Sequence, residues 1–280
     1  MESVNRTCRL RACCRISAAV VSLCKTIGGT ELMVGLRKEI VMLGVSIAAL
    51  CEVGGASAAP PQTGFLLKTI DYRGTQTRYV VFLPPDYTPN RKWPTIIFLN
   101  GYGECGTDGY KQISVGLGPA IMTNVKEWPF LVLFPQKPKH EDSWEQYDDM
   151  VMAILNKTKR EYSVDENRVY LTGLSQGGFG TWAIAAKHPD VFAAIAPICG
   201  GGRPDEMAPA LKNLPIWSFH GDADPVVKVE LSKAMVDAVN AAGGNAKLTI
   251  YPGVGHNSWD KAYREEKLGE WFLQHTRKAK

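Results

Sequence analysis

Short apolar runs rich in β-branched and aromatic residues recur along the chain from residue 65 onward, and each is about as long as one β-strand. These runs predict strands at 65–70, 78–83, 95–99, 130–134, 168–172, 193–196, 216–219 and 247–251. The runs in the middle of the series are apolar at almost every position. That pattern is typical of parallel strands that are covered on both faces of a sheet.

Longer segments with helical character separate several of these strands. They predict helices at 144–160, 177–187, 229–242 and 260–275. In the second half of the chain strands and helices alternate, which requires right-handed crossover connections. We therefore predict an α/β fold with a doubly wound, mostly parallel sheet. No linker, low-complexity tract or repeat follows residue 62, so we expect residues 59–280 to form one domain.

Residues 33–58 have a different pattern. They begin with a methionine, carry two basic residues, continue into the apolar run 40–51 and end in Ala56-Ser57-Ala58. This order is typical of a secretory signal peptide, so we expect a secreted or periplasmic protein. The apolar run is shorter than the about 20 residues that a membrane-spanning helix needs. We therefore expect no stable membrane insertion after processing.

Charge and cysteine content change once residues 1–58 are set apart as a leader. The leader holds seven of the 32 basic residues, four of the 28 acidic residues and five of the seven cysteines, so 59–280 carry a formal charge of +1. A nearly neutral domain gives no electrostatic reason to expect a nucleic-acid partner. We interpret residues 1–32 as the result of a start codon assigned too far upstream, with Met33 as the true start. A basic targeting arm is the alternative.

Three candidate catalytic residues follow three of the predicted strands. Ser175 lies in the sequence Gly-Leu-Ser-Gln-Gly between a strand and a helix, which is the setting of a nucleophile elbow, although a glycine-rich turn can contain a serine for other reasons. Asp224 follows the strand at 216–219, and His256 follows the strand at 247–251. This chain order predicts a serine nucleophile, a histidine base and a carboxylate that orients the histidine.

The acid and the base each have competitors. Asp222 is the alternative to Asp224, which we favour because it lies farther beyond the strand and precedes the stiffening Pro225. The competing histidines are His140, His188, His220 and His275. Of these, His188 is expected to cap a helix and His220 to be packed and hydrogen-bonded. No histidine has a metal-ligand spacing, so we predict no metal and no other cofactor.

Acyl transfer also needs backbone donors where negative charge develops. One predicted donor is the amide of Gln176, directly after the serine. The other is the amide of Tyr102, in the loop that follows the strand at 95–99. An ordinary glycine turn is the alternative interpretation of that loop.

Five segments of the sequence carry a resemblance to a known family: FLNGYGECGTDG, PQKPKHEDSW, GLSQGGFGTW, FHGDADPVV and YPGVGHNSWDKAY. With them the chain resembles a single-domain α/β hydrolase of the exported carboxylesterase type. That broad group contains phospholipase/carboxylesterases, dienelactone-hydrolase-like proteins and polyhydroxybutyrate-depolymerase or feruloyl-esterase-like enzymes. The resemblance implies the catalytic triad Ser175, Asp224 and His256, with the Tyr102 and Gln176 amides as the oxyanion hole.

Two positions depart from the family pattern. Asn100 stands where a histidine usually precedes the glycine, and Cys105 stands where arginine is common. Since the expected donors are backbone groups, we expect catalysis to survive, with altered substrate preference or loop rigidity. Cys105 and Cys199 either form a disulfide in an oxidising compartment or are small buried residues.

The segment 200–214 is too short for a large cap domain, so we expect an open groove. Its covering segment is expected at 106–128, and Trp144, Tyr102 and Trp259 are candidate aromatic walls for substrate, with core packing as the alternative role. Such a groove suits bulky, aryl or polysaccharide-linked esters, as in feruloyl esterases, cleaved through an acyl-enzyme.

Two other functions fit part of the pattern. A prolyl-oligopeptidase-like peptidase shares the order of the three residues, but its large propeller is missing. A non-catalytic binding protein on the same scaffold is the other, although the intact Ser, Asp and His argue against it. The expected partner is therefore a small-molecule or polymer-linked ester.

Overall fold

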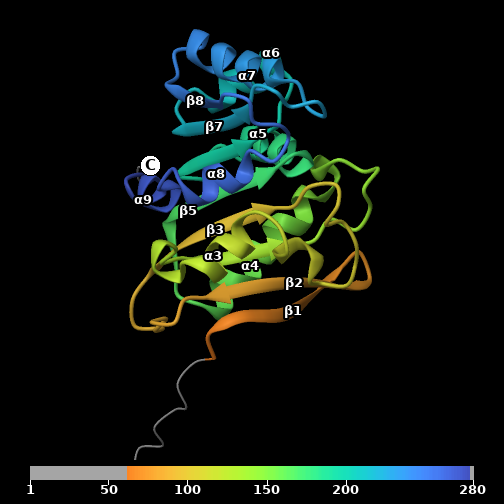
Figure 1. Ribbon diagram of the computed structural model, residues 1–280. Helices are drawn as coiled ribbons and strands as arrows, with labels where there is room; N and C mark the ends of the chain where they lie inside the picture. Colours follow the sequence, from red (N-terminus) through yellow and green to blue (C-terminus); the bar gives the residue numbers. More distant parts are fainter. Residues whose placement is uncertain (1–61, 278–280) are drawn as a thin grey trace, which may run out of the picture. The chain divides into compact units, whose positions relative to one another are not determined.

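Eight strands pair into one sheet in the computed structural model, which describes residues 62–277 (Figure 1). The strands are β1 (Gly64–Tyr72), β2 (Thr75–Leu83), β3 (Trp93–Leu99), β4 (Leu131–Pro135), β5 (Val164–Leu174), β6 (Ala194–Ile198), β7 (Ile216–Gly221) and β8 (Ala246–Tyr251). All eight predicted strands are present. The predicted leader 1–58, with its predicted signal peptide, lies outside the described residues.

The strand order in the sheet is β1-β2-β4-β3-β5-β6-β7-β8. β2 pairs antiparallel with β1 and with β4, and every other pairing is parallel. The predicted doubly wound, mostly parallel sheet is therefore confirmed. Its parallel part places the carboxyl ends of β3 to β8 at one edge, which is where ligands bind in such sheets.

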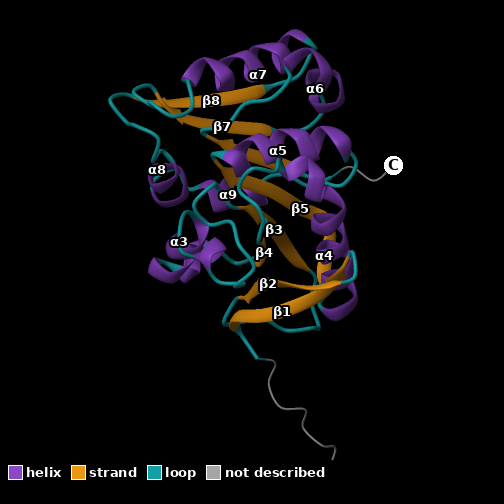
Figure 2. Ribbon diagram, turned by 90° about the vertical axis from the view of Figure 1, so that its right-hand side faces the viewer, coloured by secondary structure: helices purple, strands orange, loops and turns teal. Residues whose placement is uncertain are grey.

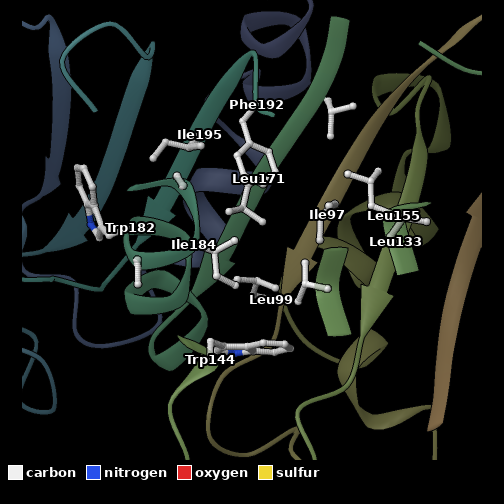
Figure 3. Packing of buried hydrophobic residues seen from close by; sticks show 14 of the residues in the cluster. Ile97, Leu99, Leu133, Trp144, Leu155, Leu171, Trp182, Ile184, Phe192 and Ile195 are labelled. Atoms are coloured by element: carbon white, nitrogen blue, oxygen red, sulfur yellow. The ribbon is translucent and has the colours of Figure 1, made fainter. Parts of the chain in front are cut away.

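Side chains of β3 show why the middle strands are apolar throughout. Ile97 and Leu99 belong to one buried cluster, and Ile96 and Phe98 belong to another. Successive side chains of a strand point to opposite faces, so a sheet covered on both faces buries every position. Figure 3 shows Ile97 and Leu99 in the first cluster, close to Trp144.

Helices cover both faces of the sheet (Figure 2). Buried apolar side chains of α4 (Asp148–Glu161), α5 (Gln176–Lys187), α6 (Pro204–Leu211) and α7 (Val229–Ala241) contribute to the first cluster. Those of α3 (Leu117–Thr123), α8 (Trp259–Arg264) and α9 (Leu268–Leu273) belong to the second. Within residues 62–277 no helix is long and apolar enough to cross a membrane.

Two expectations about helices were wrong in part. The single helix expected at 260–275 is two helices, because Lys267 adopts a left-handed backbone with a φ of 52° between α8 and α9. The short helices α3 and α6 were not predicted. Each contains proline, and α3 also contains glycine, which lowers intrinsic helix propensity, so packing against the sheet stabilises them instead.

The connection between β6 and β7 contains only α6, so no cap domain is inserted there. The segment expected to cover the groove, 106–128, contributes in part to the core. Leu117, Ile121 and Trp128 are each at most 1% exposed and pack against the sheet. Burying these three apolar side chains removes them from any groove.

Candidate active site

The turn between β5 and α5 has the geometry expected of a nucleophile elbow. Ser175, the residue before α5, has a φ of 54° and a ψ of −118°. A Cβ atom added to Gly173 would lie 2.5 Å from the carbonyl oxygen of Gly177, and one added to Gly177 would lie 2.0 Å from that of Leu99. Only glycine fits at these two positions, and the tight turn places Ser175 at the carboxyl edge of the sheet.

Ser175, His256 and Asp224 form one chain of hydrogen bonds across three loops. The Ser175 Oγ atom lies 3.0 Å from His256 Nε2, and His256 Nδ1 lies 2.7 Å from Asp224 Oδ2. The Asp224 side chain is fully buried, and the His256 side chain is 20% exposed. The structure therefore brings together the three residues that the sequence singled out.

Asp224 is held in its charged form. Its Oδ1 atom accepts hydrogen bonds from the backbone amides of Val226 at 2.8 Å and Val227 at 2.9 Å. Burial alone would raise the pKa of Asp224, but the hydrogen bonds from His256 and these amides outweigh it and keep the pKa below its usual range. A carboxylate that accepts the Nδ1 proton leaves Nε2 of His256 as the acceptor for the serine hydroxyl.

Asp222, the alternative acid, closes a turn and makes no hydrogen bond to His256. It is exposed, and its Oδ1 atom accepts the backbone amide of Gly253 at 2.6 Å, which joins the loops after β7 and β8.

The expected role of His188 as a helix cap is confirmed. Its amide donates to the carbonyl of Ile184 at the end of α5, and its Nε2 atom lies 3.1 Å from a carboxylate oxygen of Asp148.

His220 is a buried, hydrogen-bonded residue, as the sequence indicated, and it is also a neighbour of Asp224. Its Nε2 atom lies 2.9 Å from the carbonyl oxygen of Val227 and 3.2 Å from Asp224 Oδ2, while Nδ1 lies 2.7 Å from Ser232 Oγ. Burial lowers the pKa of His220 more than the carbonyl and the carboxylate raise it. His220 lies four residues before Asp224 and at the end of a strand, and this spacing could have predicted the contact between the two side chains.

The two amides predicted to form the oxyanion hole, those of Tyr102 and Gln176, donate no hydrogen bond to any other residue within 62–277. Two side chains, those of Asn100 and Glu104, hold the loop around Tyr102 by hydrogen bonds to the backbone of Gly101. Glu104 Oε2 accepts the Gly101 amide at 3.1 Å, and the buried Asn100 side chain donates to the Gly101 carbonyl at 2.7 Å. Asn100 therefore has a structural role at the position where it departs from the family pattern.

His140 joins the two oxyanion candidates, and sequence reasoning did not find this. Its ring centroid lies 4.7 Å from that of Tyr102, and its carbonyl oxygen accepts a hydrogen bond from Gln176 Nε2 at 2.9 Å. The hydrogen bond from Gln176 uses the backbone carbonyl of residue 140, which every residue type has, so the sequence could not predict it.

A cavity of about 270 Å³ lies beside Gln176. It is lined by residues 141–145, 201–203, Phe179, Gly180, Ala183 and Met207. Two of these residues, Glu145 and Arg203, come from different segments of its wall and form an ion pair at 2.6 Å. The wall is thus built by the loop before α4, by α5 and by the segment after β6.

The candidate aromatic walls have three different positions. Trp144 is 1% exposed, donates from Nε1 to the Asn100 carbonyl at 3.0 Å, and lines the cavity from the core. Trp259 is half-buried, and its ring lies edge-on to the His256 ring with centroids 5.3 Å apart. Tyr102 is 57% exposed. Trp144 is the member of this group that both packs in the core and lines the cavity.

Cys105 and Cys199 are free thiols. Burial raises the pKa of Cys199 to about 12, and its Sγ atom accepts the backbone amide of Ser175 at 3.3 Å. One ligand atom each of Cys199, Asp224 and His256 lie within 4.8 Å of one another, close enough for a metal ion. A protonated thiol is a poor ligand, and the other two groups already bond each other. The absence of a metal stays a prediction.

Residues 118–266 match the phospholipase/carboxylesterase family, and this match covers more than half of the 280 residues. The chain therefore belongs to that family. Among solved structures it is similar to a thermostable esterase, with 36% identity, a TM-score of 0.71, and coverage of 76% of this chain and 63% of that one. It also has the fold of a feruloyl esterase module from Clostridium thermocellum, at 17% identity and a TM-score of 0.61 over 76% of this chain and 89% of that one.

Curated relatives are similar over part of their length. Poly(3-hydroxyalkanoate) depolymerase C from Paucimonas lemoignei is 29% identical over 52% of this chain and 38% of its own length. Feruloyl esterase B from Neurospora crassa is 27% identical over 41% of this chain and 42% of its own length. The chain thus spans less than half the length of these relatives.

Proposed function

We propose that the protein is a serine carboxylic-ester hydrolase that works through an acyl-enzyme. The observation that carries this proposal is the hydrogen-bonded chain from Ser175 Oγ through His256 to the buried Asp224, with Ser175 at a turn of positive φ. The Tyr102 and Gln176 amides, which donate to no other residue within 62–277, support it. Membership of the phospholipase/carboxylesterase family supports it. The chain is also similar to proteins that are named esterases or a depolymerase, which supports ester hydrolysis.

In the first half of the reaction, Ser175 Oγ attacks the ester carbonyl carbon while His256 Nε2 takes the hydroxyl proton. The carbonyl oxygen becomes an oxyanion, which the amides of Tyr102 and Gln176 stabilise. When the tetrahedral intermediate collapses, the bond to the alcohol oxygen breaks and His256 gives its proton to that oxygen. The alcohol leaves, and the acyl group stays on Ser175.

In the second half, a water molecule replaces the alcohol. His256 takes a proton from the water, whose oxygen attacks the acyl carbon. Collapse of the second intermediate breaks the bond to Ser175 Oγ, and His256 returns the proton to that oxygen. The products are a carboxylic acid and the free enzyme, while the ionised Asp224 stabilises the imidazolium in both halves.

The substrate is proposed to be a bulky, aryl or polysaccharide-linked ester. The cavity beside Gln176 supports this, because Trp144, Phe179 and Met207 line it and its volume of about 270 Å³ exceeds what an acetyl group fills. Its flanking residues 141, 142 and 145 are acidic, and Arg203 already pairs with Glu145. A neutral acyl group is therefore preferred over one that carries a carboxylate.

The test combines covalent trapping with a substrate comparison on one preparation. We expect diethyl p-nitrophenyl phosphate to label Ser175, seen by mass spectrometry of its peptide, and EDTA to leave the rate unchanged. Methyl ferulate and p-nitrophenyl butyrate should be cleaved, with no cleavage of prolyl peptide substrates. Labelling at another residue would refute the mechanism, and faster peptide cleavage would favour the peptidase alternative. No turnover of any substrate, with Ser175 unlabelled, would favour the non-catalytic binding protein.

Residues 59–280 are further proposed to act after export, as a secreted or periplasmic domain. The basis is the signal-peptide pattern of 33–58 in the sequence. Expression of the full chain with its leader, followed by N-terminal sequencing of the exported protein, tests this. A new N-terminus near residue 59 is expected, and protein retained with residues 33–58 attached would refute it.

A further inference from the structure

Lys137, two residues after β4, is a buried lysine that the mechanism above does not use. Its relative exposure is 0%. Its Nζ atom donates three hydrogen bonds, to the carbonyl oxygens of Lys139 at 2.8 Å, His140 at 3.4 Å and Asp142. An ammonium group has three N–H donors, so the segment 139–142 is wrapped around it and satisfies all of them.

The three acceptors are neutral backbone carbonyls rather than carboxylates. Burying an ammonium among such groups is costly, and burial accordingly lowers the pKa of Lys137. An apolar side chain of similar length would avoid that cost, although it could not order three carbonyls that point to one place. The Lys137 ammonium therefore does what an apolar side chain could not do, because it orders these three carbonyl groups.

The backbone of Lys137 is joined to the oxyanion loop as well. Its amide donates to Asn100 Oδ1 at 3.2 Å, and its carbonyl accepts the Gly106 amide at 2.9 Å. Asn100 in turn donates to the Gly101 carbonyl, next to Tyr102. Lys137 thus holds the segment 139–142 with its side chain and the start and end of the oxyanion loop with its main chain.

The two halves of this network meet at His140. The His140 carbonyl oxygen accepts both the Lys137 ammonium at 3.4 Å and the Gln176 side chain at 2.9 Å, while the His140 ring packs on the Tyr102 ring. Both residues whose amides are assigned to the oxyanion hole therefore contact His140. Its position depends on the three hydrogen bonds from Lys137.

We propose that Lys137 is a positioning residue for the oxyanion hole, acting through the segment 139–142 and His140 on both Tyr102 and Gln176. The inference rests on the proposed serine mechanism. It implies that Lys137 contributes more to stabilising the tetrahedral intermediate than to binding a short ground-state ester such as p-nitrophenyl butyrate, since only residues 141 and 142 of its segment line the cavity. A residue that only supported the fold would not separate these two properties.

The test uses Lys137→Met, with Lys139→Met as the matched control, since Lys139 is exposed and contributes only its carbonyl oxygen to this network. The full chain is assayed with p-nitrophenyl butyrate, and titration to completion with diethyl p-nitrophenyl phosphate counts the folded sites. For Lys137→Met we expect kcat per site to fall by about 10-fold to 100-fold with KM nearly unchanged. A boronic acid that forms a tetrahedral adduct on serine should lose affinity by a similar factor. Lys139→Met should match the wild type.

A kcat and a boronic-acid affinity within about twofold of the wild type in Lys137→Met would overturn the inference, as would equal losses in Lys139→Met. If Lys137→Met does not fold, Gln176→Met replaces it, because it removes the other bond to the His140 carbonyl and keeps the Gln176 amide. Unchanged boronic-acid affinity in Gln176→Met would also overturn the inference. A wild-type protein whose Ser175 is not labelled by diethyl p-nitrophenyl phosphate would instead refute the proposed serine mechanism.

Discussion

The Nδ1 atom of His256 lies 2.7 Å from Asp224 Oδ2, whereas Asp222, only two residues earlier, directs its carboxylate to the Gly253 amide at 2.6 Å. The two aspartates follow the same strand and differ little in sequence context. Their distinct partners mean that one is bonded to the candidate base and the other closes a turn. This difference can be measured directly.

Asp224→Asn should lower kcat by about 10³-fold to 10⁴-fold, because an amide can donate to Nδ1 and so favours the wrong histidine tautomer. Asp222→Asn is the matched control and should keep the rate within about threefold, since its oxygen can still accept the Gly253 amide. The measurement is kcat on p-nitrophenyl butyrate for both proteins. A larger loss in Asp222→Asn would reverse the assignment of the acid.

Ser175→Ala should lower kcat by about 10³-fold to 10⁶-fold while the protein stays folded, because the exchange removes the hydroxyl that we propose as the nucleophile. The thermal midpoint should remain close to that of the wild type, since the exchange removes one oxygen at a position already buried to 9% exposure. Activity is measured on a freshly purified protein, with the midpoint from circular dichroism. Turnover close to that of the wild type would exclude Ser175 as the nucleophile.

Phe179→Ala should weaken use of aryl esters without impairing small ones. Phe179 is half-buried and lines the cavity beside Gln176, so its removal takes about 1.5–3 kcal/mol of apolar contact from a large acyl group. We expect KM for methyl ferulate to rise by about 10-fold or more, while KM for p-nitrophenyl acetate changes by less than about twofold. Equal effects on both esters would remove this cavity from the acyl site.

Asn100→Ala should reduce the free energy of unfolding by about 1–3 kcal/mol. The substitution leaves the buried Lys137 amide without its acceptor at 3.2 Å, and it removes the donor at 2.7 Å from the Gly101 carbonyl, which still accepts the Cys105 thiol at 3.3 Å. One orphaned buried group costs about 1–3 kcal/mol. Urea titration at constant pH gives the value, and a loss below about 0.5 kcal/mol would show that these two bonds contribute little.

The thermal midpoint should fall as the pH drops from 7.5 toward 5. Burial lowers the pKa of both His220 and His275 below the ordinary value of 6.5. The unfolded chain then binds these protons at a higher pH than the folded protein does, so stability is complete above pH 6.5 and decreases below it. The double variant His220→Gln, His275→Gln should show a smaller decrease. A decrease as large as that of the wild type would contradict the prediction.

The sequence predicted the eight strands, because hydrophobic periodicity reports which positions of a strand are buried. It also predicted Ser175, Asp224 and His256, because each of them follows one of these strands. The elbow was also available, since Gly173 and Gly177 are required wherever a backbone passes this close to another carbonyl. These features depend on interactions that are local along the chain or on which face of an element is buried.

Other features depended on the tertiary structure alone. The break at Lys267, the burial of 117–121 and the cavity beside Gln176 follow from how the elements pack and which loops then meet. The contacts of His140 and Lys137 use backbone carbonyls, which every residue possesses. Periodicity along a chain determines its secondary elements, whereas only the packed sheet determines which distant atoms come within hydrogen-bonding distance.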